Sequence, residues 1–578
     1  MKINGIGASN GIAVGKVLLL KEEKIKISDS KISEKSVESE VKKLDKAMAA
    51  TKTELNELIT KTQKKLGNKH AEIFEAHLSI LEDPELYEQI KDLIVNEKFN
   101  VVKAVDVTCT NFYQLFSALE DEYLRERAAD ILDIKTKILN ELLGIKDNVL
   151  NNIKQEVIIV ANDLTPSQTS QLDPKFVKGF LCNIGGRTSH SAIMARSLGI
   201  PAVVGLKDIT TKVKDKTNIA LNGNSGEVEF NLNDEQIKTW KEHEKKWINL
   251  KTELLSFKGK ETITKDGYQF KLEANVGSTK DLNSALENDA HGIGLFRTEF
   301  LYMENDNFPT EAEQFTEYKT VLKTMSKFKV VIRTLDIGGD KKLTYWNLPH
   351  EMNPFLGYRA IRLCLDQKDI FKTQIRALLQ ASTSGQLAIM FPMVATVEEF
   401  KEAKDFVLQC KTELIKEGKK VSDNILIGMM IEVPSSAVNA EIFAKYADFF
   451  SIGTNDLIQY TLAADRMSEK VSYLYQPYHP AVLRLIKMTI DGAKAHDKKI
   501  PVGMCGEMAG DKIAIPLLVG MGLDEFSMSA SDILAARKLI NSLNKKDMEL
   551  LVAEALKCDT HDEVKTLVIK KLGNLLDF

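Results

Sequence analysis

Residues 425–456 have the sequence ILIGMMIEVPSSAVNAEIFAKYADFFSIGTND, in which two largely apolar runs flank a helical segment. The first run covers 425–431 and leads into Glu432, and the second covers 448–453 and leads into Asp456. Strand-length runs separated by a helix predict consecutive strands of a βαβ unit. This stretch therefore favours a sheet built from alternating strands and helices.

The same alternation extends over the second half of the chain. Eight strand-like runs alternate there with helical segments, at 269–275, 292–296, 329–334, 388–392, 425–431, 448–453, 500–505 and 525–528. Alternating units of that number predict a (β/α)8 barrel over residues 261–578. In such barrels the chemistry lies at the carboxyl ends of the strands.

Charged and polar side chains follow several of these runs, and we expect them to converge on one rim of the barrel. They are Arg297, Arg333, Asp336, Glu432, Asn455, Asp456, Arg466, Cys505 and Glu507. A single such residue is more often part of the surface or of a salt bridge, and a lone cysteine is more often a buried structural thiol. Convergence of several on one rim favours a site instead.

The residue types on this rim suit an anionic, phosphorylated substrate bound with Mg²⁺. Arginine grips phosphate and carboxylate groups in a planar, bidentate way, so Arg297, Arg333 and Arg466 are the predicted clamps. Magnesium prefers hard oxygen ligands, commonly one or two carboxylates plus substrate oxygens, which makes Glu432 and Asp456 the predicted ligands.

Three further rim residues have less specific roles. Asn455 can add a neutral donor to the substrate site. Cys505 can donate a proton to the enolate that loss of a phosphoryl group leaves. The sequence leaves two roles open for Glu507, which are support of the site from behind and a structural ion pair.

The strongest local motif is GGRTSHSAIMARSLGIPAVVG, residues 185–205. A strand ends there in a glycine turn, Thr188 or Ser189 supplies a helix N-cap, and His190 falls in the first turn. A phosphoryl group on its imidazole would lie near free backbone N–H groups and the positive end of the helix dipole, with Arg187 adding a cation. Neutral imidazole is a good nucleophile near pH 7, so His190 is the predicted phosphoryl acceptor.

The first half of the chain divides by its patterns. Strand-like runs in residues 1–20 and 147–230 predict one α/β domain. Residues 33–145, rich in Lys, Glu, Leu and Ala at helical spacing, predict an all-helical insertion in that domain. Residues 231–260 contain a charged amphipathic stretch that fits either a stiff linker or an ordinary packed surface helix.

Composition excludes several classes of protein. The chain has 578 residues, too many for one core, and its net charge of -4 gives no electrostatic case for nucleic acid or an anionic membrane. Six scattered cysteines without a CxxC pair argue against a zinc site or disulfide framework and suit a reducing, cytoplasmic location. No apolar run reaches the ~18 residues that span a bilayer, so no membrane insertion is expected.

The segment around His190 resembles the phosphohistidine motif of the phosphoenolpyruvate (PEP)-utilising enzymes. Its RTSH form, which includes Arg187, is similar to enzyme I of the bacterial sugar phosphotransferase system rather than to pyruvate phosphate dikinase. The resemblance extends in order along essentially the whole chain. It includes GIGASNGIAVGK (5–16), GLFRTEFLYM (294–303), RTLDIGGDK (333–341), NPFLGYRAIR (353–362), MIEVPSSA (430–437), FFSIGTNDLIQYTLAADR (449–466) and VGMCGEMAG (502–510).

The resemblance implies an α/β fold with a swivelling phosphohistidine domain, an inserted helical subdomain that docks a carrier, and a PEP-binding barrel that dimerises. It implies that His190 takes a phosphoryl group from PEP with Mg²⁺ through its Nε2, releases pyruvate, and phosphorylates the phosphocarrier protein HPr. Cys505 would protonate the enolate, and Glu432 and Asp456 would hold Mg²⁺. The implied PEP-binding residues are Arg297, Arg333, Asn455, Asp456 and Arg466, with Arg359 matching the family pattern although it follows no predicted strand.

Two alternative functions belong to different classes, another enzyme and a non-catalytic protein. A synthase or dikinase that phosphorylates pyruvate with a nucleotide would need an ATP-binding domain, for which the chain has neither the room nor a P-loop. A non-catalytic scaffold or regulator would be expected to have lost site residues. The sequence retains His190, Glu432, Asp456 and Cys505, which argues against a non-catalytic protein.

Overall fold

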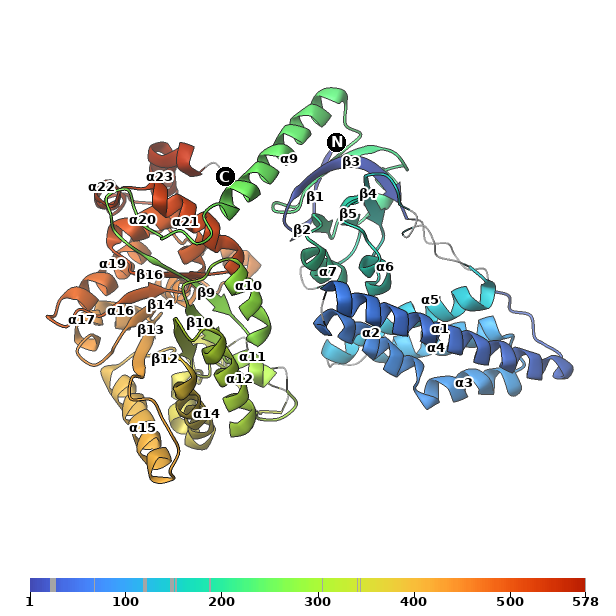
Figure 1. Ribbon diagram of the computed structural model, residues 1–578, viewed down its shortest axis with the longest axis horizontal. Helices are drawn as coiled ribbons and strands as arrows, with labels where there is room; N and C mark the ends of the chain where they lie inside the picture. The colour runs from blue at the N-terminus through green and yellow to red at the C-terminus, as the bar shows by residue number, and fades with distance from the viewer. Residues whose placement is uncertain are drawn as a thin grey trace. The chain divides into compact units, whose positions relative to one another are not determined.

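The computed structural model describes residues 1–20, 27–66, 68–117, 122–145, 150, 153–186, 189–303, 305–339, 341, 343 and 345–576. The chain forms two compact units, Met1–Leu250 and Lys251–Phe578 (Figure 1). Within the described residues, no helix is both long and apolar enough to cross a membrane.

An eight-stranded sheet forms the α/β part of the first unit. In spatial order its strands are β1 (Lys2–Asn4), β8 (Glu227–Phe230), β7 (Asn218–Asn222), β3 (Ile12–Leu19), β4 (Val157–Ala161), β5 (Val177–Cys182), β6 (Ala202–Val204) and β2 (Ile6–Ser9). The neighbours from β3 to β6 are parallel, and the other pairs are antiparallel. The strands expected in this half of the chain are confirmed.

Both faces of this sheet are buried, which explains why its central strands are apolar throughout. Ile159 and Phe180 pack on one face with the helix α7 (His190–Leu198). Ile158 and Leu181, their neighbours in sequence, pack on the other face with α8 (Ile209–Lys212). A short helix, α6 (Pro166–Ser170), lies against α7.

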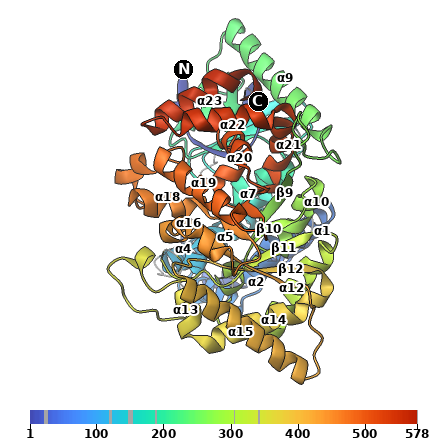
Figure 2. The ribbon, with the colours of Figure 1, turned by 90° about the vertical axis from the view of Figure 1, so that its left-hand side faces the viewer.

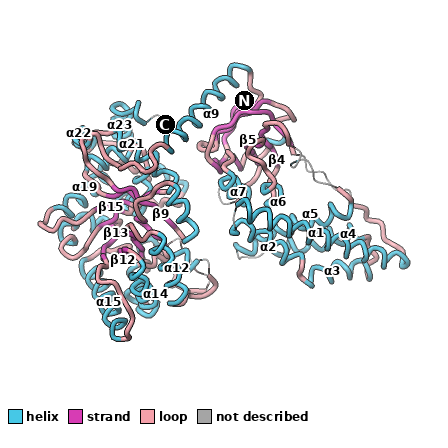
Figure 3. The backbone as a smooth tube through the Cα atoms, viewed as in Figure 1, coloured by secondary structure: helices cyan, strands magenta, loops and turns pink. Residues whose placement is uncertain are grey.

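The inserted block is all-helical, as expected (Figure 3). Its helices are α1 (Val37–Leu66), α2 (Asn68–Leu81), α3 (Pro84–Val95), α4 (Val101–Ser117) and α5 (Glu122–Leu143). Leu44, Phe74, Ile90 and Ile138 lie in its separate apolar core. The Asp83 carboxylate caps α3 by accepting from the backbone N–H of Glu85 at 2.9 Å.

The helix α9 (Asp234–Leu255) follows the last strand of the sheet. Its beginning is fixed to that strand by Glu229, a buried carboxylate. The Trp240 indole donates to Glu229 Oε2 at 2.8 Å, and the Gln236 amide donates to Oε1 at 2.6 Å. The amphipathic stretch therefore forms one continuous helix whose first turns pack on the sheet.

The second unit is a closed barrel of eight parallel strands, which confirms the expected (β/α)8 architecture. The strands are β9 (Lys271–Val276), β10 (Ile293–Arg297), β11 (Lys329–Arg333), β12 (Gln386–Phe391), β13 (Leu426–Ile431), β14 (Phe450–Ile452), β15 (Val502–Met504) and β16 (Glu525–Met528). Pairing of β16 with β9 closes the ring.

Helices surround the barrel strands (Figure 2). They are α10 (Leu282–Glu287), α11 (Glu299–Met303), α12 (Glu311–Thr324), α13 (Ile361–Asp366), α14 (Lys368–Ala381), α15 (Val397–Lys416), α16 (Pro434–Val438), α17 (Ala440–Phe443), α18 (Thr454–Leu462), α19 (Pro480–Lys494), α20 (Ala514–Met521), α21 (Ile533–Ser542), α22 (Lys545–Ala555) and α23 (His561–Leu576).

A charged group is buried near the amino-terminal end of the barrel. Lys329 Nζ lies 3.6 Å from Glu273 Oε1 and forms a short ion pair with Glu525. Burial raises the pKa of the Glu273 carboxyl to about 7. Burial would also raise the pKa of Glu525, but Lys329 holds it below its usual value. Lys329 therefore compensates the negative charge of Glu525 more fully than that of Glu273.

Replacing Glu273 by Gln should change the pH dependence of stability. The pKa of Glu273 is about 7 in the folded protein against 4.5 for the free group, so the stability that the protonated carboxyl contributes is lost as pH rises through this interval. An amide stays neutral throughout. The free energy of unfolding of Glu273→Gln relative to the wild type should therefore rise by about 1–3 kcal/mol between pH 5 and pH 8, measured by denaturant titration.

Glu525→Gln is the matched control. It leaves Lys329 without its closest partner and should lower stability at both pH values. Parallel pH profiles for Glu273→Gln and the wild type would contradict the assignment of the raised pKa to Glu273.

Candidate functional site

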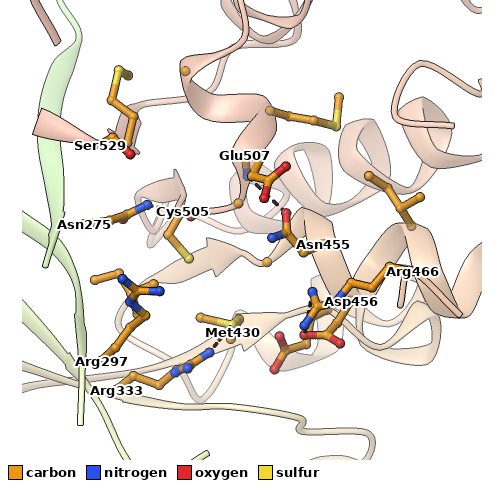
Figure 4. Close-up of a pocket in the computed structure, with 18 of the residues that line it drawn as sticks. Asn275, Arg297, Arg333, Met430, Asn455, Asp456, Arg466, Cys505, Glu507 and Ser529 are labelled. Carbon is orange, nitrogen blue, oxygen red and sulfur yellow. Dashed lines mark hydrogen bonds and ion pairs between the residues drawn. The ribbon is translucent and has the colours of Figure 1, made fainter. Parts of the chain in front are cut away.

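The carboxyl ends of the barrel strands surround a cavity of about 760 Å³ (Figure 4). The structure brings together at this cavity every side chain that the sequence placed on the rim. They are Arg297, Arg333, Asp336, Glu432, Asn455, Asp456, Arg466, Cys505 and Glu507. The strand order explains the convergence, because parallel strands end on the same side of a closed barrel.

Local structure fixes two neighbouring carboxylates that line the cavity, Glu432 and Asp456. Glu432 directly follows β13, and Asp456 lies in the first turn of α18, where the helix dipole favours a negative charge. Gly453, between β14 and α18, allows this turn to pack closely against the end of β13. A Cβ atom there would lie 2.9 Å from Glu432 Oε2.

Glu432 is a buried carboxylate with little compensation. Its Oε1 accepts from the backbone N–H of Met393 at 2.6 Å. Across the described ranges, no ion pair joins it to a lysine or arginine. Burial, followed by the negative charge of Asp456, raises the pKa of Glu432 to about 8. A cation placed between the two carboxylates would relieve this repulsion.

The donor set at this position fits Mg²⁺. Hard oxygen ligands are present on Glu432 and Asp456, and a magnesium site commonly takes only one or two protein carboxylates besides substrate oxygens and water. Asp456 is held loosely by cations, with Arg359 Nη1 at 3.5 Å and Arg466 Nη1 at 3.9 Å. In the described part of the chain, no three or more His, Cys, Asp and Glu side chains are grouped so that they could hold a metal ion.

Arg333 is held in place by two carboxylates, of which the sequence predicted Asp336 on the rim but not Glu299. Arg333 Nη2 lies 2.6 Å from Glu299 Oε1 and 3.0 Å from Asp336 Oδ2. Lys341 Nζ, which the sequence also left out, binds the same two carboxylates at 2.9 and 2.8 Å. Glu299 lies in α11 and Lys341 in the long segment after β11.

Arg297 is less constrained. Its guanidinium lies 4.8 Å from the centre of the Phe300 ring, and its buried Nε has no hydrogen-bond partner within the described residues. Arg333 Nε is likewise buried and has no hydrogen-bond partner among the described residues. Both arginines line the cavity, and a guanidinium group is suited to bind an anion that enters it.

Arg359 lies behind the cavity rather than on its lining. It is buried, with 1% of its surface exposed, and its Nη2 contacts Asp336 Oδ1 at 2.9 Å. Its Nη1 contacts Asp456 at 3.5 Å and the Tyr460 hydroxyl at 3.3 Å. Arg359 therefore links two carboxylates of the site, and it comes just before α13 rather than after a strand.

Cys505 follows β15 and faces the cavity (Figure 4). Burial raises the pKa of its thiol to about 11, so the thiol keeps its proton near pH 7. Its sulfur is therefore poised as an acid rather than as a thiolate nucleophile.

The segment around His190 lies in the first unit. Ser189 is the N-cap of α7 and accepts from the backbone N–H of Ala192 at 3.4 Å, which settles the choice between the two predicted caps. His190 is the first residue of α7. Arg187 and Thr188 lie outside the described residues.

Three family models match the chain. Residues 251–545 match the PEP-binding domain of PEP-utilising enzymes, residues 4–127 match the N-terminal part of these enzymes, and residues 153–226 match their mobile domain. The matched barrel residues include the whole lining of the cavity.

The chain is also similar to named proteins. It is 54% identical over 574 residues to the phosphoenolpyruvate-protein phosphotransferase of Mycoplasma capricolum subsp. capricolum, covering 99% of each chain. It is 52% identical over 567 residues to the protein of that name from Staphylococcus carnosus, covering 98% of each chain. A solution NMR structure of enzyme I (nEIt) is 40% identical, covers 42% of this chain and 99% of its own, and has a TM-score of 0.38.

Mg²⁺ should stabilise the protein through the neighbouring carboxylates of Glu432 and Asp456. Glu432 must lose its proton to bind a cation, and its pKa is about 8, so the rise in melting temperature caused by Mg²⁺ should be larger at pH 8 than at pH 6. Mg²⁺ at a hundred times its dissociation constant would add about 2.7 kcal/mol. Glu432→Gln should abolish the rise, whereas Glu525→Gln, at the other end of the barrel, should keep it. An equal rise in both variants would place the cation elsewhere.

Proposed function

The chain belongs to the PEP-utilising enzymes, among the phosphoenolpyruvate-protein phosphotransferases, and from that premise we propose that it catalyses two successive phosphoryl transfers through His190. In the first, PEP phosphorylates His190 and pyruvate is released. In the second, phosphohistidine 190 phosphorylates a histidine of the phosphocarrier protein HPr.

One observation carries the proposal. A single cavity gathers several arginines, two neighbouring carboxylates and a protonated thiol. These are the groups needed to bind a phosphorylated carboxylate, to hold a divalent cation against it, and to protonate the enolate that it leaves.

In the proposed substrate complex, PEP lies in the cavity with its phosphate and carboxylate groups bound by cations. Arg297, Arg333, Asn455 and Arg466 all line this space. Glu432 and Asp456 would hold Mg²⁺, which when bound would neutralise negative charge on the phosphate. Arg359 would keep Asp456 in place from behind.

In the first transfer, Nε2 of His190 attacks phosphorus as the bond from phosphorus to the enol oxygen breaks. The electron pair of that bond stays on oxygen and gives the enolate of pyruvate. The arginines stabilise the charge that spreads over the phosphoryl oxygens. Cys505 gives its thiol proton to C3 of the enolate, pyruvate leaves, and the thiolate recovers a proton from water.

The second transfer requires His190 to meet the carrier. His190 belongs to the first unit and the cavity to the second, so the phosphohistidine domain must move between the barrel and the carrier. The match of residues 153–226 to a mobile domain supports this motion. We assign carrier docking to the helical block, residues 33–145.

We extend the proposal to the organisation of the chain. Residues 1–20 and 147–230 form the phosphohistidine domain, residues 231–260 the linker and residues 261–578 the PEP-binding barrel, through which two copies associate. The protein works in the cytoplasm, which the free state of all six cysteines supports. We expect no nucleic-acid partner and no insertion into a membrane.

Labelled PEP tests the two transfers. With PEP labelled at phosphorus and Mg²⁺, the protein should acquire an acid-labile, base-stable label, and His190→Ala should acquire none. Purified HPr should then remove the label from the protein and become labelled itself. His77→Ala, in the helical block, is a control of the same residue type and should still be labelled.

The competing proposal is a non-catalytic scaffold or regulator. It predicts no label in the wild type under the same conditions. Label that appears on the wild type but never moves to HPr would support the first transfer and contradict the choice of carrier.

A further inference from the structure

Asn275 is a cavity residue to which the reaction has so far assigned no role. It is the penultimate residue of β9, and its side chain lines the cavity beside Cys505 (Figure 4). It came at the end of a run that the sequence pattern marked as a strand, so its polar side chain attracted no functional prediction.

The Asn275 amide connects three strands at the seam where the barrel closes. Its Nδ2 donates to the backbone carbonyl of Cys505 at 2.9 Å, and that group also lies 3.4 Å from the carbonyl of Ser527. Its Oδ1 accepts from the Ser527 hydroxyl at 2.7 Å. Ser527 is a buried residue of β16. The two backbone carbonyls can only accept, so they fix the amino end of the amide toward Cys505.

The turn that carries the thiol is held on its other side by β14 and α18. The Cys505 N–H donates to the carbonyl of Ile452 at 3.1 Å, and the Glu507 N–H donates to Asn455 Oδ1 at 3.1 Å. A Cβ atom at Gly506 would lie 1.9 Å from the Thr454 hydroxyl oxygen, so the turn also packs closely on α18. Asn275 supplies the corresponding restraint from the β9 side.

We propose that Asn275 is a positioning residue that holds the Cys505 thiol over one face of the enolate. The inference rests on the proposed function, in which Cys505 protonates C3. An enolate is planar, and a fixed acid delivers its proton to one face only. A thiol that is free to move loses that selectivity, and an enol that escapes is protonated by water on both faces.

The stereochemistry of the methyl group of pyruvate reports this position directly. PEP with one deuterium in a defined place on C3, converted in tritiated water, gives a methyl group with three different hydrogen isotopes. The S–H bond of Cys505 breaks, the new C3 bond forms with the π electrons of the enolate, and solvent restores the thiol. Wild-type protein should give one chirality in excess.

Asn275→Ala should lose at least half of that excess, while phosphorylation of His190 by PEP falls by no more than about tenfold, because the phosphate-binding residues keep their contacts. Asn275→Asp keeps the acceptor for Ser527 but places a carboxylate oxygen against the Cys505 carbonyl, and it should show the same loss. Cys505→Ala gives the reference value for complete loss.

Asn288→Ala is the matched control. Asn288 lies outside the cavity at the end of α10, where its amide donates to the carbonyl of Ser284 at 2.9 Å, and its replacement should leave the chirality unchanged. Should Asn275→Ala fail to fold, Ser527→Ala, which removes the hydroxyl that donates to the amide oxygen, should show a partial loss.

Undiminished chirality in folded Asn275→Ala or Asn275→Asp overturns the inference. A lower phosphorylation rate with unchanged chirality would show a purely structural role and overturns it as well. Failure of the proposed function has a different signature, because wild-type protein would then form no phosphohistidine at all. If the wild type forms phosphohistidine but the methyl group of its pyruvate is racemic, Cys505 is not the proton donor. Asn275 then has no role in positioning it.

Discussion

The pairing of β16 with β9 is the interaction on which the cavity depends. It closes eight parallel strands into a ring, so side chains separated by more than two hundred residues meet at one end. The same pairing sets Ser527 beside Asn275 and, through it, next to Cys505. Without closure the strand ends would not share a rim, and the charges there would be solvated separately.

Closure buries charge at both ends of the barrel, with different consequences. Near the amino-terminal end, Lys329 lies close to Glu273 and Glu525 and compensates part of their charge. At the carboxyl end, burial raises the pKa of Glu432 to about 8 beside a cavity of about 760 Å³ that arginines line. A perturbed carboxyl among arginines in a large cavity is typical of a site organised for a ligand rather than for stability.

Periodicity and run length were sufficient to predict the barrel, the sheet and the helical insertion, because each element buries an apolar face that leaves a regular pattern. Most rim residues were predictable for the same reason, since they lie at or just after the end of a run, whereas Arg466 lies further along the chain. Arg359 and Lys341 lie away from the run ends, and only the resemblance pointed to Arg359. Glu299 lies as close to a run end as Asp456 does, but nothing in the pattern separated it from an ordinary helix residue. Asn275 is the last residue of its predicted strand and was counted as part of that strand. Its importance comes from a contact with Cys505, 230 positions later, which no local pattern reveals.

The central claim is that the protein transfers the phosphoryl group to itself and holds it until a carrier arrives. A single-turnover measurement with a small excess of PEP and Mg²⁺, in the absence of HPr, tests this most directly by counting pyruvate and phosphohistidine together. The account predicts that both appear in equal amounts, about one per chain, and that pyruvate formation then stops. Pyruvate that continues to accumulate without a carrier, or forms without phosphohistidine, would contradict it.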